Sequence, residues 1–238
     1  MKVIYIDVET TSVNSEESYK VINNSDMELK PAHYHIFIGS QSLGKAILQK
    51  PPGSIIQLAG IIVIDGEEKE RFNFNMRPLI GSNIEDGALE VNGVTREELE
   101  TFPPATGVCK DLMGIFKTYV SPYDKRDKFT MRAYNAGFDE GFIYHWFRAL
   151  DNYGIATWVH RPAVCVMQKA ARILQGTHLH PINFKLKTVA EALGIDTSEI
   201  NFHDAMADID VTMQIDKLLD LPFVTLEARR IPGSKVYL

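Results

Sequence analysis

The alternation of apolar and polar residues predicts that the chain begins with strands. Residues 3–8 form a β-branched run that predicts a strand, and residues 55–65 form a second, almost wholly apolar strand that is buried on both faces. Asp65 and Gly66 predict a turn. After it, residues 71–76 alternate phenylalanine and methionine with polar residues, which predicts a half-buried strand pairing back on its neighbour. These segments predict a three-stranded meander.

Helical spacing of apolar residues dominates the rest of the chain, interrupted by one short predicted strand at residues 130–135. The predicted helices cover residues 106–120, 142–150, 164–174, 186–193 and 205–219. Strands first and helices interleaved later indicate an α/β domain with a mixed sheet.

Residues 14–54 lack a clear period and separate the first strand from the second. Long structureless loops inside compact domains are uncommon and often functional, so we interpret this segment as an insertion after the first strand. It carries its own hairpin near residues 34–38, or else it is a disordered lid. We expect one domain over residues 1–220 that contains this insertion, followed by a C-terminal extension over residues 221–238.

Composition and charge exclude several classes of protein. The 238 residues are 45% hydrophobic and 24% charged, which is typical of a globular protein and not of a disordered or fibrous one. The net charge is −6, so the chain lacks the basic face that usually grips duplex phosphates. An acidic chain can still be a nucleic-acid enzyme if metal ions neutralise a local carboxylate cluster.

The compartment follows from the cysteines and the apolar runs. Cys109 and Cys165 form no Cys-x-x-Cys pair, which favours two reduced thiols over a zinc or redox motif. The longest apolar run, at residues 55–64, is about half a membrane span. We therefore expect a soluble, cytoplasmic protein with no membrane partner.

Two carboxylates end the first predicted strand. Asp7 and Glu9 are two residues apart, so a strand places both on one face. Carboxylates held that close repel each other unless a cation lies between them, which makes the pair a half-site for a hard metal. A strand that simply runs out into solvent would place acids there too.

Two further segments carry candidate chemistry. Asp139 lies near a predicted helix N-terminus, where the helix dipole favours a carboxylate even without a metal. His203 and Asp208 are five residues apart and would not share a helix face. We place His203 in the preceding loop and Asp208 one turn inside the helix. Asp204 and Asp210 are expected to face solvent and not to bind metal.

Three runs, taken together and in this order, resemble the motifs of the DnaQ-like, or DEDDh, 3′–5′ exonucleases. The runs are IDVETT at residues 6–11, YNAGFD at 134–139 and HDAMAD at 203–208, and ALEVNGVT at 88–95 is similar to a further family segment. The resemblance implies a ribonuclease H-like fold, in which a mixed β-sheet is flanked by helices. It also implies an enzyme that hydrolyses phosphodiesters.

The resemblance assigns a role to each acidic residue. It implies two divalent ions, Mg²⁺ or Mn²⁺, which suit a site of carboxylate oxygens. Asp7 would bridge both ions. Glu9 and Asp208 would complete the site of the ion that activates water, and Asp139 would hold the second ion through water. His203 would be the general base, since its ordinary pKa of about 6.5 suits that task at neutral pH.

Substrate-binding residues are implied less directly. Thr10 and Thr11 would position the terminal sugar and phosphate, and Asn135 would either touch substrate or orient the turn. Ser12 and Val13 stand where the family has glycine and then leucine, and in relatives that leucine packs against the terminal base. Four basic residues either line the path of the strand or belong to a solvated helix face: Lys169, Arg172, Lys185 and Lys187.

We therefore predict a metal-dependent exonuclease that releases nucleoside 5′-monophosphates from the 3′ end of single-stranded DNA or RNA. DNA is favoured over RNA only because it is the more typical substrate of the family that the chain resembles. A homodimer, and a polymerase partner if the role is proofreading, both stay open. Two alternatives compete: a phosphodiesterase that uses the same carboxylates on small nucleotides, and a non-catalytic nucleic-acid binding module.

Overall fold

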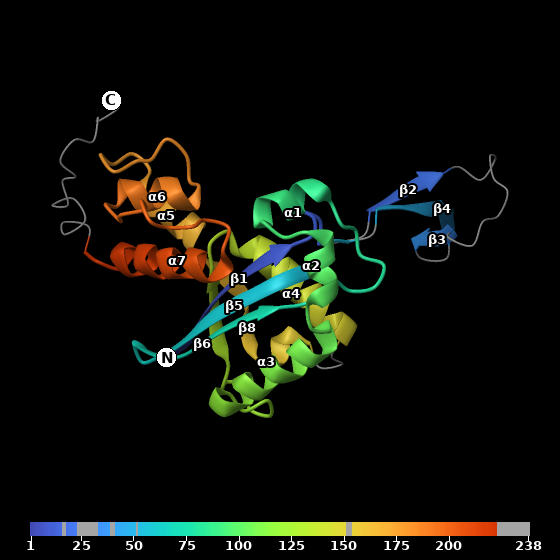
Figure 1. The fold of residues 1–238 in the computed structure, drawn as a ribbon, viewed down its shortest axis with the longest axis horizontal. Coiled ribbons are helices and arrows are strands. Elements are labelled where there is room, and N and C mark those ends of the chain that lie inside the picture. The colour runs from blue at the N-terminus through green and yellow to red at the C-terminus, as the bar shows by residue number, and fades with distance from the viewer. Residues whose placement is uncertain (16–17, 23–32, 39–40, 51, 151–153, 223–238) are drawn as a thin grey trace.

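A mixed β-sheet forms the centre of the protein, as Figure 1 shows. The structure is a computed structural model of the chain, and it describes residues 1–15, 18–22, 33–38, 41–50, 52–150 and 154–222. The strands of the central sheet are β1 (Lys2–Thr10), β5 (Ile55–Ile64), β6 (Glu67–Asn75), β7 (Phe129–Ala133) and β8 (Val159–Cys165). Their order across the sheet is β6-β5-β1-β7-β8, so β1 is the central strand.

Three of these strands form the predicted meander. β1 pairs antiparallel with β5, and β5 pairs antiparallel with β6. Glu9 on β1 lies opposite Gln57 on β5, and Gln57 lies opposite Asn75 on β6. The register therefore aligns these three polar residues in one row across the sheet. Gly60 on β5 leaves room for the Phe72 ring on β6, because a Cβ at residue 60 would lie 2.2 Å from that ring.

The other two strands run parallel to β1. The strand expected at residues 130–135 is β7. The apolar pattern does not predict β8, because this strand lies at the sheet edge and most of its residues are partly or fully exposed. An edge position also tolerates Pro162 within the strand. The helix expected from residue 164 consequently begins only at Val166.

Helices occupy most of the remaining described chain. They are α1 (Asp86–Asn92), α2 (Arg96–Thr101), α3 (Ala105–Tyr119), α4 (Ala136–Leu150), α5 (Val166–Leu174), α6 (Leu186–Ala192) and α7 (Ala205–Leu219). The apolar pattern predicts α3, α5, α6 and α7 within two residues of their observed starts, but it misses α1 and α2. These two are too short to show a helical period, although Thr95 and Glu98 form a capping box at the start of α2.

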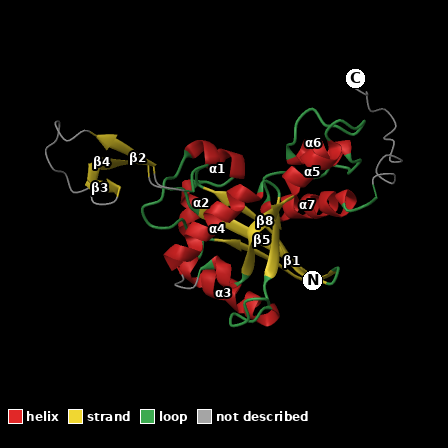
Figure 2. Ribbon diagram, turned by 180° about the vertical axis from the view of Figure 1, so that it is seen from behind, coloured by secondary structure: helices red, strands yellow, loops and turns green. Residues whose placement is uncertain are grey.

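The helices cover the sheet on both faces (Figure 2). α3 and α4 pack on the face that carries Ile4, Ile6 and Val8 of β1, where the largest apolar cluster lies. α7 packs on the opposite face, against Val3 and Tyr5. α5 and α6 then pack on α7. The α/β fold with a mixed sheet and flanking helices is thus confirmed.

The insertion after the first strand forms a small sheet of its own. It contains β2 (Ser18–Ile22), β3 (His33–Ile38) and β4 (Gln41–Lys50), paired in the antiparallel order β2-β4-β3. The hairpin expected near residues 34–38 is therefore part of a three-stranded sheet, which projects away from the central sheet in Figure 1.

The predicted domain boundaries are not tested by the structure. All but two residues of the expected extension over 221–238 lie outside the described part of the chain, and the single domain over 1–220 stays a prediction. Within the described residues, every helix is too short or too polar to cross a membrane.

Candidate active site

The first two acids lie where β1 ends. Side chains alternate along a strand, so Asp7 and Glu9 share a face with Val3 and Tyr5. Val3 and Tyr5 pack against α7. The strand therefore delivers both carboxylates to the α7 side of the sheet, as the spacing predicts.

The third acid comes from the opposite layer. Asp139 lies in the first turn of α4 and is 3% exposed. Its carboxylate accepts a hydrogen bond of 3.2 Å from the backbone N–H of Val8, which fixes it beside β1. α4 begins at Ala136, earlier than the sequence predicts, so Asp139 is inside the helix and close to its N-terminus.

Asn135 makes the turn that places Asp139. Its φ of 58° is left-handed, a conformation that asparagine tolerates better than most residues. Its carbonyl accepts from the N–H of Phe138 at 2.9 Å, which begins the helix. The structure therefore shows the turn-forming role of Asn135. Its side chain is exposed, and contact of this side chain with substrate stays a prediction.

The last two residues lie at the start of α7. His203 precedes the helix with a φ of 70°, and Asp208 lies in its first turn. Ligand atoms of Glu9, His203 and Asp208 all lie within 4.8 Å of one another. This matches the predicted placement of His203 in the loop and Asp208 inside the helix.

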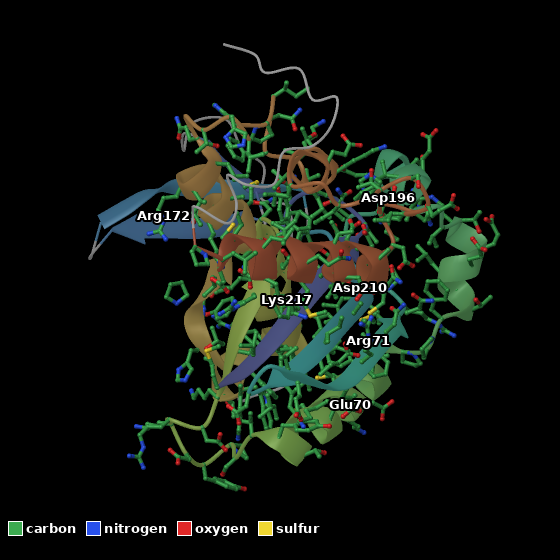
Figure 3. The ribbon with its side chains drawn as sticks, turned by 90° about the vertical axis from the view of Figure 1, so that its left-hand side faces the viewer. Glu70, Arg71, Arg172, Asp196, Asp210 and Lys217 are labelled. Carbon is green, nitrogen blue, oxygen red and sulfur yellow. The ribbon has the colours of Figure 1, made fainter. Side chains whose placement is uncertain are left out.

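The two neighbouring aspartates have structural contacts. Asp204 caps α7 by accepting from the N–H of Ala207 at 3.0 Å. Asp210 forms an ion pair of 2.9 Å with Arg71, which lies on β6 beside α7 in Figure 3. The expectation that both face solvent holds in part, because each is partly exposed and is also bonded within the protein.

The electrostatics of the acids show an uncompensated cluster. Burial, followed by the charges of Asp139 and Glu9, raises the pKa of Asp7 well above its usual value. Burial and the charge of Asp208 raise the pKa of Glu9 to about 8. Burial raises the pKa of Asp139 to about 7 and that of Asp208 to about 6, although hydrogen bonds with backbone N–H groups partly offset both shifts.

These residues fit a hard divalent cation. Carboxylates held this close favour a cation between them. Oδ1 of Asp208 is buried and has no hydrogen-bond partner among the described residues, which is what a ligand atom awaiting an ion would show. Oxygen donors suit Mg²⁺ or Mn²⁺.

The two threonines have internal partners. The Thr10 hydroxyl donates to the carbonyl of Ser12 at 2.8 Å. The Thr11 hydroxyl donates to the carbonyl of Asn83 at 2.6 Å and accepts from the N–H of Ser54 at 2.9 Å. Both side chains are buried, so they shape the loop after β1, and their contact with substrate stays a prediction. Val13, at the position of the family's leucine, is 73% exposed.

Sequence reasoning missed a polar cavity of about 170 Å³ next to the acids. Glu9 and His203 line it together with four carboxamide side chains, those of Gln57, Asn75, Asn92 and Asn201. The polar residues in the strands at 55–65 and 71–76 were a signal for Gln57 and Asn75. Asn201 reaches the cavity only through the tertiary fold.

Comparison with known proteins identifies the class. A family model described as an exonuclease, that of RNase T, matches residues 4–215. That range includes all four acids and His203 and covers most of the chain. The chain therefore belongs to this exonuclease family, which confirms the resemblance seen in the motifs and the prediction of a nuclease. No curated protein sequence matches the chain.

Solved structures agree with the fold. E. coli exonuclease I in complex with a dT13 oligonucleotide aligns with a TM-score of 0.62 and 18% identity, over 92% of this chain and 40% of that one. The nuclease domain of 3′hExo, a DEDDh family member bound to rAMP, aligns with a TM-score of 0.59 and 14% identity, over 92% of this chain and 91% of that one. The chain thus spans well under half of exonuclease I but nearly all of the smaller domain.

Proposed function

We propose that this protein is a metal-dependent 3′–5′ exonuclease that shortens single-stranded nucleic acid and releases nucleoside 5′-monophosphates. The observation that carries the proposal is the convergence of the predicted site residues from three distant parts of the chain: Asp7, Glu9, Asp139, His203 and Asp208. A single-stranded substrate is supported by analogy with the structural neighbour that holds a dT13 oligonucleotide. Action at the 3′ end is supported by another neighbour, a 3′-exonuclease described as recognising the 3′ end of a histone mRNA stem-loop.

The four carboxylates would hold two divalent ions, which supply an activated water and stabilise the leaving oxygen. His203 would accept the proton of the attacking water on its ring. It extends from a loop beside Glu9 and Asp208 and is itself exposed, so the ring has room to take up and release a proton. Water adds to phosphorus and the bond to the preceding 3′ oxygen breaks, which leaves a new 3′ hydroxyl on the shortened strand.

The groups around the acids would position the strand. We propose that the loop of Thr10 and Thr11, and the exposed side chain of Asn135, contact the terminal nucleotide. Val13 would pack against the terminal base in place of leucine, with a smaller contact area. A cytoplasmic location, a homodimer and a polymerase partner remain predictions from the sequence.

The test uses 5′-labelled single-stranded DNA and RNA of matched sequence, incubated with Mg²⁺, Mn²⁺ or EDTA and separated on a sequencing gel. We expect a ladder that shortens from the 3′ end and is abolished by EDTA. A dinucleotide cleaved much faster than a ten-nucleotide strand would favour the small-nucleotide phosphodiesterase. Tight binding of the strand without metal-dependent turnover would favour the binding module.

A further inference from the structure

The carboxamide-lined cavity adjoins the proposed site of hydrolysis. Glu9, Gln57 and Asn75 are consecutive partners across β1, β5 and β6, so their side chains point to the same face of the sheet. Asn92 enters from the end of α1, and Asn201 from the loop before α7. Glu9 and His203 belong both to the cavity and to the cluster of ligand atoms. A group bound here would touch the reacting centre directly.

The lining has a particular hydrogen-bonding character. Each carboxamide both donates and accepts hydrogen bonds and carries no charge. Among the described residues, neither lysine nor arginine lines the cavity, so it lacks the cationic side chains that usually hold a phosphate group. A hydroxyl group can donate to a carboxylate or amide oxygen and accept from an amide N–H.

Free capacity remains on these amides. The Gln57 amide donates to the side chain of Asn73 at 3.1 Å, and the Asn92 amide donates to the carbonyl of Thr10 at 3.0 Å. Both keep their carbonyl oxygens for another partner. Within the described residues, no hydrogen bond of the Asn75 or Asn201 side chain is seen, so both can turn toward a ligand. Val94 and Phe102 add an apolar wall.

We propose that this cavity binds the sugar of the 3′-terminal nucleotide and recognises its 2′-hydroxyl, so that the enzyme prefers a terminal ribonucleotide. The proposal rests on the proposed exonuclease function. The sugar is the part of the terminal nucleotide that is bonded to the scissile phosphate, so it must lie next to Glu9 and His203. The 2′-hydroxyl, a donor and an acceptor, distinguishes RNA from DNA at such a site. The preference is opposite to the DNA preference expected from the family alone.

The experiment uses DNA strands that differ only at the last sugar. Three 5′-labelled strands end in a ribonucleotide, a deoxyribonucleotide or a 2′-fluoro nucleotide, and kcat/KM for removal of that nucleotide is measured with Mg²⁺. We expect wild type to remove the ribonucleotide about tenfold faster than the deoxyribonucleotide, since one or two neutral hydrogen bonds change a rate by about 3- to 10-fold each. The 2′-fluoro strand, which cannot donate a hydrogen bond, should behave like the deoxyribonucleotide.

Variants then assign the preference to the cavity. Asn75→Leu and Asn201→Leu, combined, should bring the ribose-to-deoxyribose ratio close to one. A melting temperature and a circular dichroism spectrum close to those of wild type show that the variant is folded. Gln214→Leu removes an exposed carboxamide of α7 outside the cavity and should leave the ratio unchanged.

The outcomes separate the two proposals. If wild type removes the terminal nucleotide of all strands at one rate, or prefers deoxyribose, the sugar inference is wrong and the exonuclease stands. An unchanged ratio in the double variant likewise overturns the inference, because some other part of the site then recognises the sugar. If wild type shortens no strand with either Mg²⁺ or Mn²⁺, the proposed function fails and the inference with it.

Discussion

Two carboxylate sites lie where α7 packs on the sheet, and they differ in the charged groups that surround them. Asp216, near the end of α7, is fully buried and accepts hydrogen bonds from Tyr5 at 2.6 Å and Lys169 at 2.7 Å, and from Arg132. These partners lower the pKa of Asp216 in spite of its burial. Asp7 lies two residues after Tyr5 on the same strand, yet its pKa is raised.

The difference lies in the charges that the protein supplies. Asp216 has two cationic partners, both themselves largely buried. Among the described residues, the four acids of the candidate site have no ion pair with lysine or arginine, and three of them have other carboxylates as neighbours. A buried carboxylate whose charge is paired with cationic side chains stabilises the fold. A cluster of carboxylates without such partners is stable in the charged form only when a cation binds from outside the protein.

The largest effect is expected from a substitution at the candidate site. Asp7→Asn should lower kcat by about 10³-fold or more, because metal ions supply several kcal/mol of transition-state stabilisation. The melting temperature without metal should hold or rise, because a repelling charge is removed. Rate assays and calorimetry in EDTA check both. Asp111→Asn, at an exposed position of α3, is the control, and equal activity of the two variants would contradict the site.

The opposite result is expected at the compensated acid. Asp216→Asn should lower the free energy of unfolding by about 3 kcal/mol, because it leaves Arg132 and Lys169 largely buried with only the more exposed Asp220 as a counter-charge. Urea unfolding measures the loss. Asp220→Asn removes a more exposed partner of the same lysine and should cost about 1 kcal/mol or less. Similar losses in both variants would show that burial does not distinguish them.

His203 tests whether the site is organised for proton transfer. His203→Ala should slow hydrolysis by about 10²-fold or more and should remove the acidic limb of the pH–rate profile. The rise in melting temperature that Mg²⁺ causes should remain, because carboxylates hold the ion. His178→Ala replaces another exposed histidine as the control. Loss of the Mg²⁺ effect would instead make His203 a ligand.

The two sites should respond to pH with opposite sign. Glu9 and Asp139 have pKa values of about 8 and 7 in the folded state, above those of the unfolded chain, so the folded state binds more protons between about pH 4.5 and 8. Without metal, the free energy of unfolding should therefore fall as pH rises through this window, by up to about 1.4 kcal/mol per pH unit for each proton released.

Asp216 has a lowered pKa, so its stabilisation is present at neutral pH and is lost as pH falls below about 4. Melting temperatures in EDTA and in Mg²⁺ across pH 3–9 measure both trends. Mg²⁺ should abolish the loss at high pH, since it binds the deprotonated carboxylates. A loss that persists in Mg²⁺ would mean that the cluster is not the metal site.

The smallest effect concerns the turn that places Asp139. Asn135→Gly should keep stability within a few tenths of a kcal/mol, whereas Asn135→Ala should cost about 1–2 kcal/mol because its φ of 58° is left-handed. The glycine variant also tests substrate contact. If it keeps full kcat/KM, Asn135 acts through the turn alone, and if KM rises with stability unchanged, the side chain touches substrate.

The sequence was sufficient where chemistry depends on local spacing. A period of two on β1 predicted that Asp7 and Glu9 share a face, and the five-residue spacing predicted His203 in a loop before Asp208. Elements with a clear apolar period were also predicted. β8, α1 and α2 were not, because an exposed edge strand and very short helices show no such period.

Contacts between distant residues were decided only by the tertiary structure. From the sequence, Lys169 could either line the path of the nucleic-acid strand or belong to a solvated helix face. In the structure it donates a hydrogen bond to the buried carboxylate of Asp216. The tertiary structure likewise brings Asn201 beside Gln57 and Asn75 to form the carboxamide cavity. Short-range periods specify which face a side chain takes. Which faces then meet depends on how helices and sheet pack, and it is this packing that leaves one acid paired and the others awaiting a cation.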